Sequence, residues 1–205
     1  MAPPTLIYFD VPGRAGAIRL AFFIGGVEFE DKLVTFEELA ASPTLKYVPV
    51  LQMDGTEYTQ STALLRYAGR ASGLSPEDPL TSLKVDEIVM AVEDIYHAIG
   101  TTMHVQDQQK KLKMRQGLCT GKIKEFVEIL EAKLLANPSS PFFVGDSLTI
   151  ADLAMHSIMA TFELGIETLE GFPPTLVPDI SPALKEHQDA VLEHPKVMEY
   201  YASKK

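Results

Sequence analysis

The sequence has a single cysteine, no long apolar run and no basic excess, and each lack argues against a class of protein. One cysteine cannot form an internal disulfide, which favours a reducing, cytoplasmic setting. The formal net charge of −10 argues against nucleic acid and anionic membrane surfaces as partners. The apolar runs are far shorter than the ~20 residues of a membrane-spanning helix, and the first ten residues show no secretory signal.

Signatures of metal and redox chemistry are also missing. The five histidines do not have the spacing of metal ligands, so no metal site is expected. Cys119 has no CxxC partner, which argues against disulfide oxidoreductase chemistry. The basic run QQKKLKMR, residues 108–115, is expected to be a solvated helix face.

The N-terminal part of the chain alternates strand and helix patterns. The expected elements are a strand at 5–9, a helix from Arg14 to the Gly25-Gly26 pair, a strand at 27–34, a weak helix at 35–41, a hairpin at 48–59 and a helix at 62–70. This βαβαββα order predicts an α/β domain of thioredoxin-like type over residues 1–76.

The rest of the chain has almost no strand signal. A polar linker, SPEDPLTS, begins at Ser75, and apolar residues then recur at helical spacing over 88–103 and 123–134. Thr149 to Asp152 has the pattern of a capping box, and Pro182 and Pro195 stand at first helical positions. We therefore expect an all-helical C-terminal domain over residues 84–205.

The stretch KYVPVLQMDGTEYTQS, residues 46–61, is a candidate recognition element. Its DG dipeptide favours a two-residue hairpin turn, and Ser61 is expected as the N-cap of the next helix, whose free N–H groups favour a carboxylate. A cis Val48-Pro49 bond would turn the Val48 main chain outward, where an extended peptide could pair with it. The stretch indicates a site for a small peptide with a carboxylate, and an ordinary edge hairpin with a capped helix explains it equally well.

Three stretches together resemble a known family. LIYFDVPGRAGAIRLAF, VPVLQMDGTEYTQS and FFVGDSLTIADL, in this order and spacing, are similar to cytosolic glutathione S-transferases of the tyrosine type, closest to the sigma class. The resemblance covers nearly the whole chain. It implies glutathione as co-substrate, an electrophile site shared between the two domains, and a homodimer.

The resemblance implies catalytic roles for Tyr8 and Arg14. The Tyr8 hydroxyl would donate a hydrogen bond to the glutathione sulfur, supported by Arg14. A thiol of pKa about 8.5 is only about 3% thiolate at pH 7, and the thiolate is the nucleophile. Lowering that pKa by about two needs roughly 2.7 kcal/mol, which one charge-assisted hydrogen bond of about 1.5–3 kcal/mol largely supplies. Without the resemblance, Tyr8 fits a core position on a strand.

The resemblance also implies the remaining glutathione contacts. Gln60 and Ser61 would hold the γ-glutamyl carboxylate, and Asp94 would reach the α-amino group across the dimer, although a solvated helix face is the alternative for Asp94. The chain lacks the tryptophan that sigma enzymes usually place at the glycine carboxylate, so Lys46 is the nearest candidate there. The glutathione set is Tyr8, Arg14, Lys46, Tyr47, Val48, Pro49, Gln60, Ser61 and Asp94.

An electrophile pocket is expected between the two domains. Its candidate lining is Phe9, Gly13, Tyr96, Thr101, Ala154 and Ile158. Core packing explains the last four of these equally well. The small side chains at several of these positions suggest an open pocket for a broad range of apolar molecules.

The predicted function is therefore a glutathione transferase that adds the glutathione thiolate to small apolar electrophiles in detoxification. A glutathione-dependent isomerase similar to prostaglandin D synthase would use the same site. A non-catalytic structural or binding homologue is a third reading. The joint presence of Tyr8, Arg14, Gln60 and Ser61 argues against it.

Overall fold

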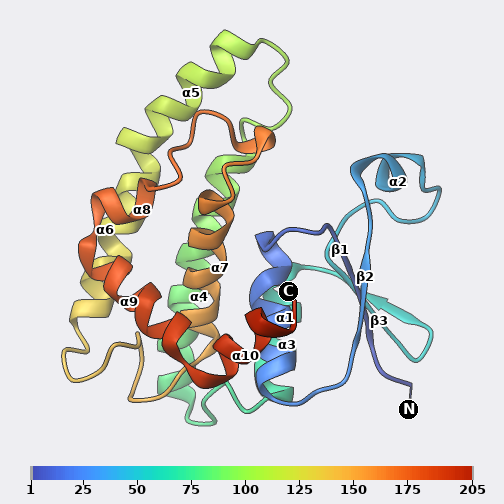
Figure 1. The fold of residues 1–205 in the computed structure, drawn as a ribbon, viewed down its shortest axis with the longest axis vertical. Coiled ribbons are helices and arrows are strands. Elements are labelled where there is room, and N and C mark those ends of the chain that lie inside the picture. The colour runs from blue at the N-terminus through green and yellow to red at the C-terminus, as the bar shows by residue number, and fades with distance from the viewer. Residues whose placement is uncertain (1, 205) are drawn as a thin grey trace.

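A four-stranded sheet forms the base of the N-terminal part in the computed structural model, which describes residues 2–204 (Figure 1). The strand order is β2-β1-β3-β4, with β1 parallel to β2 and antiparallel to β3. The strands are β1 Thr5–Tyr8, β2 Glu30–Leu33, β3 Val50–Met53 and β4 Thr56–Tyr58. Tyr8 is the last residue of β1, the buried central strand, and pairs with Leu33 of β2.

Helices α1 and α3 lie between this sheet and the helical part of the chain (Figure 1). The N-terminal helices are the 3₁₀ turn Gly13–Ala15, α1 Gly16–Ile24, α2 Phe36–Ala41 and α3 Ser61–Ala71. Helix α1 is buried over its first seven residues and contacts both α3 and α7. The α/β arrangement predicted for this part is therefore confirmed.

The C-terminal part is entirely helical over its described residues, as predicted. Its elements are α4 Pro79–Gly100, α5 Gln108–Thr120, α6 Lys122–Leu135, α7 Ile150–Glu163, the 3₁₀ turn Glu167–Leu169, α8 Leu176–Ile180, α9 Pro182–Glu193 and α10 Pro195–Ser203. Helix α7 is buried along nearly its whole length because α1, α4 and α9 pack around it. Within residues 2–204, no helix has the length and apolar character needed to cross a membrane.

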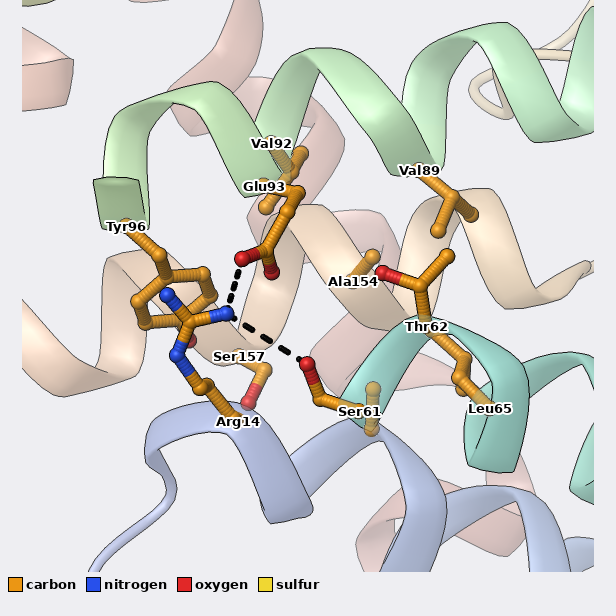
Figure 2. Close-up of a pocket in the computed structure, with 11 residues that line it drawn as sticks. Arg14, Ser61, Thr62, Leu65, Val89, Val92, Glu93, Tyr96, Ala154 and Ser157 are labelled. Carbon is orange, nitrogen blue, oxygen red and sulfur yellow. Dashed lines mark hydrogen bonds and ion pairs between the residues drawn. The ribbon is translucent and has the colours of Figure 1, made fainter. Parts of the chain in front are cut away.

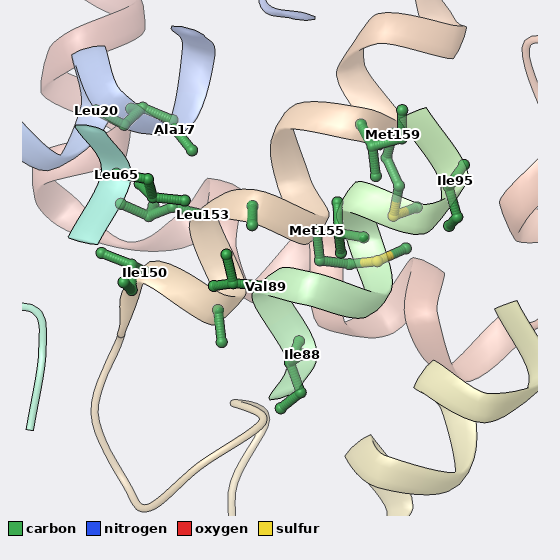
Figure 3. Close-up of a cluster of buried hydrophobic side chains, with 14 of the residues drawn as sticks. Ala17, Leu20, Leu65, Ile88, Val89, Ile95, Ile150, Leu153, Met155 and Met159 are labelled. Atoms are coloured by element: carbon green, nitrogen blue, oxygen red, sulfur yellow. The ribbon is translucent and has the colours of Figure 1, made fainter. Parts of the chain in front are cut away.

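One hydrophobic core joins the two parts. Figure 3 shows Leu20 of α1, Leu65 of α3, Val89 of α4 and Leu153 of α7 gathered in it. Each of the four is at most 6% exposed. Because α7 contributes to this core and also contacts α1, the N-terminal helices dock on a helix of the C-terminal part.

Local sequence signals fix several element ends as predicted. Thr149 and Asp152 form a capping box at the start of α7, and α9 and α10 begin at Pro182 and Pro195. The Val48-Pro49 bond is cis, as expected.

Other ends differ from the prediction. The strand expected over 27–34 is shorter, Glu30–Leu33, and Arg14 lies in a 3₁₀ turn before helix α1 rather than in the helix itself. Ser61 is not the N-cap of α3 but its first residue, and Gln60 precedes it with a φ of 74°. The Ser61 hydroxyl accepts a hydrogen bond from the Arg14 guanidinium instead of capping its own helix.

The solvated face predicted for residues 108–115 is wrong at Arg115. This side chain is 2% exposed, although it belongs to an otherwise polar helix, α5. It donates hydrogen bonds to the Thr102 hydroxyl and to the carbonyl oxygens of Thr168 and Glu170. Three acceptors from neighbouring segments compensate for the burial of the cation.

The carboxylate of Asp152 should be important for stability. It is fully buried and accepts hydrogen bonds from the N–H groups of Phe143 and Thr149, and His187 Nε2 lies 3.0 Å away. Asp152→Ala leaves these groups without their acceptor, so we expect the free energy of unfolding to fall by about 3–5 kcal/mol in urea titrations. The exposed Asp146→Ala should change it by less than about 0.5 kcal/mol. Similar values for both variants would contradict this assignment.

His156 should make stability depend on pH. It is 2% exposed, and burial, with a smaller effect of His187, lowers its pKa from 6.5 to about 4. Between these two pKa values the unfolded chain binds more protons than the folded chain. The free energy of unfolding is therefore highest above pH 6.5 and falls as the pH drops, by roughly 3 kcal/mol in total.

Urea unfolding between pH 4 and 7 tests this dependence. We expect His156→Phe to flatten the curve and His104→Phe, at an exposed histidine, to leave it unchanged. An unchanged slope in His156→Phe would show that other groups control it.

Candidate active site

Tyr8 lies at the end of β1, with its hydroxyl against the following turn. The backbone N–H of Arg14 donates to Tyr8 Oη over 3.1 Å. Burial raises the pKa of Tyr8 above its usual 10, outweighing the opposing effects of the Arg14 N–H and charge, so the hydroxyl keeps its proton at neutral pH. Among the described residues no group accepts that proton, and it remains available to a ligand.

Gly13 fixes the turn that faces Tyr8. Its φ is +43°, and a Cβ at this position would lie 2.5 Å from Tyr8 Oη, so glycine is required here. Its carbonyl oxygen accepts hydrogen bonds from Tyr96 Oη and Ser157 Oγ, both at 2.8 Å. Its N–H donates to Thr161 Oγ1 over 3.0 Å. Side chains of α4 and α7 therefore hold a turn of the N-terminal part.

The Arg14 side chain connects three elements. Its Nη1 forms an ion pair with Glu93 of α4 and lies 3.4 Å from the Ser61 hydroxyl of α3 (Figure 2). The guanidinium carbon lies 4.9 Å from the centre of the Tyr96 ring. Both charged partners are about a quarter exposed, so the pair stays partly hydrated.

These residues surround a small cavity of about 30 Å³, which has room for about two water molecules. Its lining is Arg14, Ala17, Ser61, Thr62, Leu65, Val89, Val92, Glu93, Tyr96, Ala154 and Ser157. Of the predicted electrophile residues, Tyr96 and Ala154 line this cavity, and the Arg14 guanidinium lies beside the Tyr96 ring (Figure 2). Burial raises the pKa of the Tyr96 phenol.

Several residues of the predicted glutathione set lie on the exposed surface. Lys46 Nζ donates to the carbonyl oxygen of Ser42 on its own loop, and Tyr47 is 78% exposed. Gln60 and Asp94 are also exposed. Three residues of the glutathione set, Tyr8, Arg14 and Ser61, are joined by the hydrogen bonds described above. Val48 and Pro49 lie directly before β3.

The predicted electrophile residues separate into two groups. Gly13, Tyr96 and Ala154 lie together, whereas Thr101 is exposed at the end of α4, where its hydroxyl donates to the carbonyl oxygen of Ala98. Ile158 is fully buried in the core, which agrees with the alternative of core packing. It follows Ser157 in the sequence and therefore points about 100° further around α7.

Phe9 belongs to neither group. It is partly buried, and its ring stacks on Phe36 with 4.1 Å between the ring centres. This places Phe9 beside α2.

The predicted site residues do not include Glu93, Ser157 and Thr161, which the structure brings to the site. Glu93 precedes Tyr96 by three residues, the spacing that puts two side chains on the same helix face. Ser157 and Thr161 are hydroxyl residues four apart on an otherwise largely apolar helix, and both are buried. Such a pair indicates a polar group on the facing segment, which here is the Gly13 backbone.

Two family models match the chain. The model of the glutathione S-transferase N-terminal domain matches residues 4–70, and that of the C-terminal domain matches residues 93–204. "Glutathione S-transferase 3" of Caenorhabditis elegans is 29% identical over 97% of this chain and 95% of its own. "Hematopoietic prostaglandin D synthase" of Gallus gallus is 32% identical over 72% of this chain and 73% of its own.

A solved structure agrees with these matches. The monomeric glutathione S-transferase Na-GST-3 of Necator americanus is 26% identical, with a TM-score of 0.75 over all of this chain and 98% of its own. The domain models cover most of the sequence, and their order matches the sheet and helical parts of the fold. The chain belongs to the glutathione S-transferase family, which uses glutathione as co-substrate.

Proposed function

We propose that this glutathione transferase adds the thiolate of glutathione to small apolar electrophiles, with Tyr8 as the hydrogen-bond donor to the sulfur. The observation that carries the proposal is the state of the Tyr8 hydroxyl. Its oxygen already accepts the Arg14 N–H, and burial keeps the phenol protonated, so its O–H is left to donate. A donor held in this way favours the anionic form of a thiol placed against it.

Glutathione would bind along the N-terminal part. In this proposal Ser61 and Gln60 hold the γ-glutamyl carboxylate at the start of α3, where free N–H groups favour an anion. The Val48 and Pro49 backbone contacts the cysteinyl part. Lys46 and Tyr47 are proposed for the glycine end, for which their exposed loop leaves them accessible.

The proposed electrophile site is centred on Gly13, Tyr96 and Ala154, which lie together. The small cavity that Tyr96 and Ala154 line favours compact, apolar substrates or ones that displace the Arg14 side chain. We further propose sigma class, a cytoplasmic location and a role in detoxification. The sigma-type motifs and the single cysteine support these assignments.

A second candidate is a glutathione-dependent isomerase that uses the same thiolate. It is supported by the similarity to the chicken protein named hematopoietic prostaglandin D synthase. Isomerisation returns glutathione unchanged, whereas transfer consumes it. The free-thiol concentration during turnover therefore separates the two reactions.

Tyr8→Phe tests the proposed mechanism, because it removes one oxygen atom and keeps the ring. We expect kcat for conjugation of a chromophoric aryl halide to fall about 10- to 100-fold at pH 7, since one charge-assisted hydrogen bond is lost. The KM for glutathione should change little, and the rates should approach the parent rate at high pH, where the thiol ionises without help.

Tyr58→Phe is the matched control, at a tyrosine of β4 that is 46% exposed. Equal rates for the Tyr8 and Tyr58 variants would remove Tyr8 from the mechanism. A parent protein that binds glutathione and leaves it unconsumed, but rearranges a prostaglandin endoperoxide, would support the isomerase.

We also propose a homodimer in which Asp94 contacts glutathione bound to the partner. Leu83, Met90 and Asp94 are spaced seven and four residues apart on α4, so they share one face, and each is exposed. Apolar side chains on an exposed face indicate a contact surface. The Necator americanus relative described as monomeric makes the oligomeric state a question for measurement.

Sedimentation at micromolar concentration should give the mass of a dimer. Asp94→Asn should raise the KM for glutathione by about 3- to 10-fold with kcat nearly unchanged, because a charged contact to the α-amino group is lost. Asp189→Asn, at an exposed residue of α9, is the control. A monomer that conjugates normally would rule out the role of Asp94 across an interface.

A further inference from the structure

Three hydroxyl groups from the helical part hold the two polar atoms of the Gly13 backbone. Tyr96 and Ser157 donate to its carbonyl oxygen at 2.8 Å, and Thr161 accepts its N–H at 3.0 Å. The Thr161 hydroxyl donates its own hydrogen bond to the carbonyl oxygen of Ser157, so its oxygen can accept the Gly13 N–H. We call Tyr96, Ser157 and Thr161 the hydroxyl clamp.

Tyr96 and Ser157 act on the same peptide group that contacts the catalytic tyrosine, and Thr161 holds the preceding peptide through the Gly13 N–H. The carbonyl of Gly13 and the N–H of Arg14 belong to one peptide unit, which is planar. Two hydrogen bonds that fix the carbonyl oxygen therefore also fix the direction of the N–H at the opposite edge. That N–H donates to Tyr8 Oη over 3.1 Å.

The clamp also affects the strength of this donor. Hydrogen bonds in a chain polarise one another, so an amide whose carbonyl accepts two hydroxyl protons donates more strongly through its N–H. The effect passes from the Gly13 carbonyl to the Arg14 N–H and then to Tyr8 Oη. A stronger donor to Oη makes the phenol O–H a stronger donor in turn.

Glycine makes this direct coupling possible. At a φ of +43°, any Cβ at Gly13 would lie 2.5 Å from Tyr8 Oη, so the turn packs against the hydroxyl with no room between them. A shift of the peptide unit by a few tenths of an ångström would be felt at the phenol oxygen.

We propose that Tyr96, Ser157 and Thr161 are positioning residues that set the acidity of bound glutathione through the Gly13–Arg14 peptide and Tyr8. This inference rests on the proposed function, since it assigns the clamp to the hydrogen bond between Tyr8 and the sulfur. The helical part thereby contributes to thiolate formation as well as to electrophile binding.

The test measures the fraction of bound glutathione present as thiolate, from its ultraviolet absorbance, as the pH is varied. Tyr96→Phe and Ser157→Ala each remove one donor to the Gly13 carbonyl without adding bulk. We expect each to lower the thiolate fraction at pH 7 and kcat by about threefold, and the double variant by about tenfold. The KM for glutathione should stay within about twofold, and rates should converge on the parent rate at high pH.

Two controls separate positioning from a general loss of stability. Ser181→Ala removes a buried hydroxyl that accepts the Leu184 N–H at the start of α9, with no hydrogen bond to Gly13. It should lower the unfolding temperature and leave the thiolate fraction unchanged. Thr161→Val should lower the thiolate fraction, whereas Thr161→Ser, which keeps the hydroxyl, should restore it.

The outcomes distinguish the inference from the proposed function. An unchanged thiolate fraction in the double variant, with a lowered one in Tyr8→Phe, would overturn the inference and leave the function standing. An unchanged fraction in Tyr8→Phe would overturn both. If the double variant does not fold, the Thr161 pair decides, and equal thiolate fractions in Thr161→Val and Thr161→Ser would overturn the inference.

Discussion

The peptide unit between Gly13 and Arg14 is the constraint on which the site depends. Its N–H meets Tyr8, and its carbonyl meets hydroxyls from α4 and α7. Hydrogen bonds at both edges leave this short turn little freedom to rotate, although turns of this kind are usually among the more mobile parts of a protein. The N-terminal part alone contains Tyr8 and Arg14, but the groups that aim the peptide come from the helical part. The two parts must therefore dock before the site is complete.

The Arg14 side chain adds a second connection across the same boundary. It joins Glu93 of α4 to Ser61 of α3, and its guanidinium lies over the Tyr96 ring of α4. Burial has the largest effect on the pKa of Tyr8 and raises it. The Arg14 charge lowers this pKa, and the Glu93 charge raises it. A partly exposed ion pair contributes little to stability. Its main consequence is geometric, because it holds the guanidinium against α4.

Much of the fold could be predicted because its signals are local. A capping box, a proline at a first helical position and a cis proline before a hairpin each involve residues only a few positions apart. The partners of Gly13 could not be found this way, since Thr161 is 148 residues away and Tyr96 is 83. The same holds for Arg115, whose acceptors lie on other segments. Ser61 was misassigned as a cap because no local pattern reveals that a distant arginine uses its hydroxyl.

Amide hydrogen exchange at Gly13 and Arg14 tests most directly whether the two parts hold this peptide. Both N–H groups donate to side chains in the folded protein, to Thr161 and to Tyr8. We expect them to exchange as slowly as the amides of the buried strand β1, because releasing the Gly13 N–H requires the turn to separate from α7. Releasing the Arg14 N–H requires rotation of the peptide whose carbonyl Tyr96 and Ser157 hold. Exchange as fast as at the exposed Gly55 turn would contradict the account, since it would mean that the Gly13–Arg14 peptide rotates freely and cannot position Tyr8.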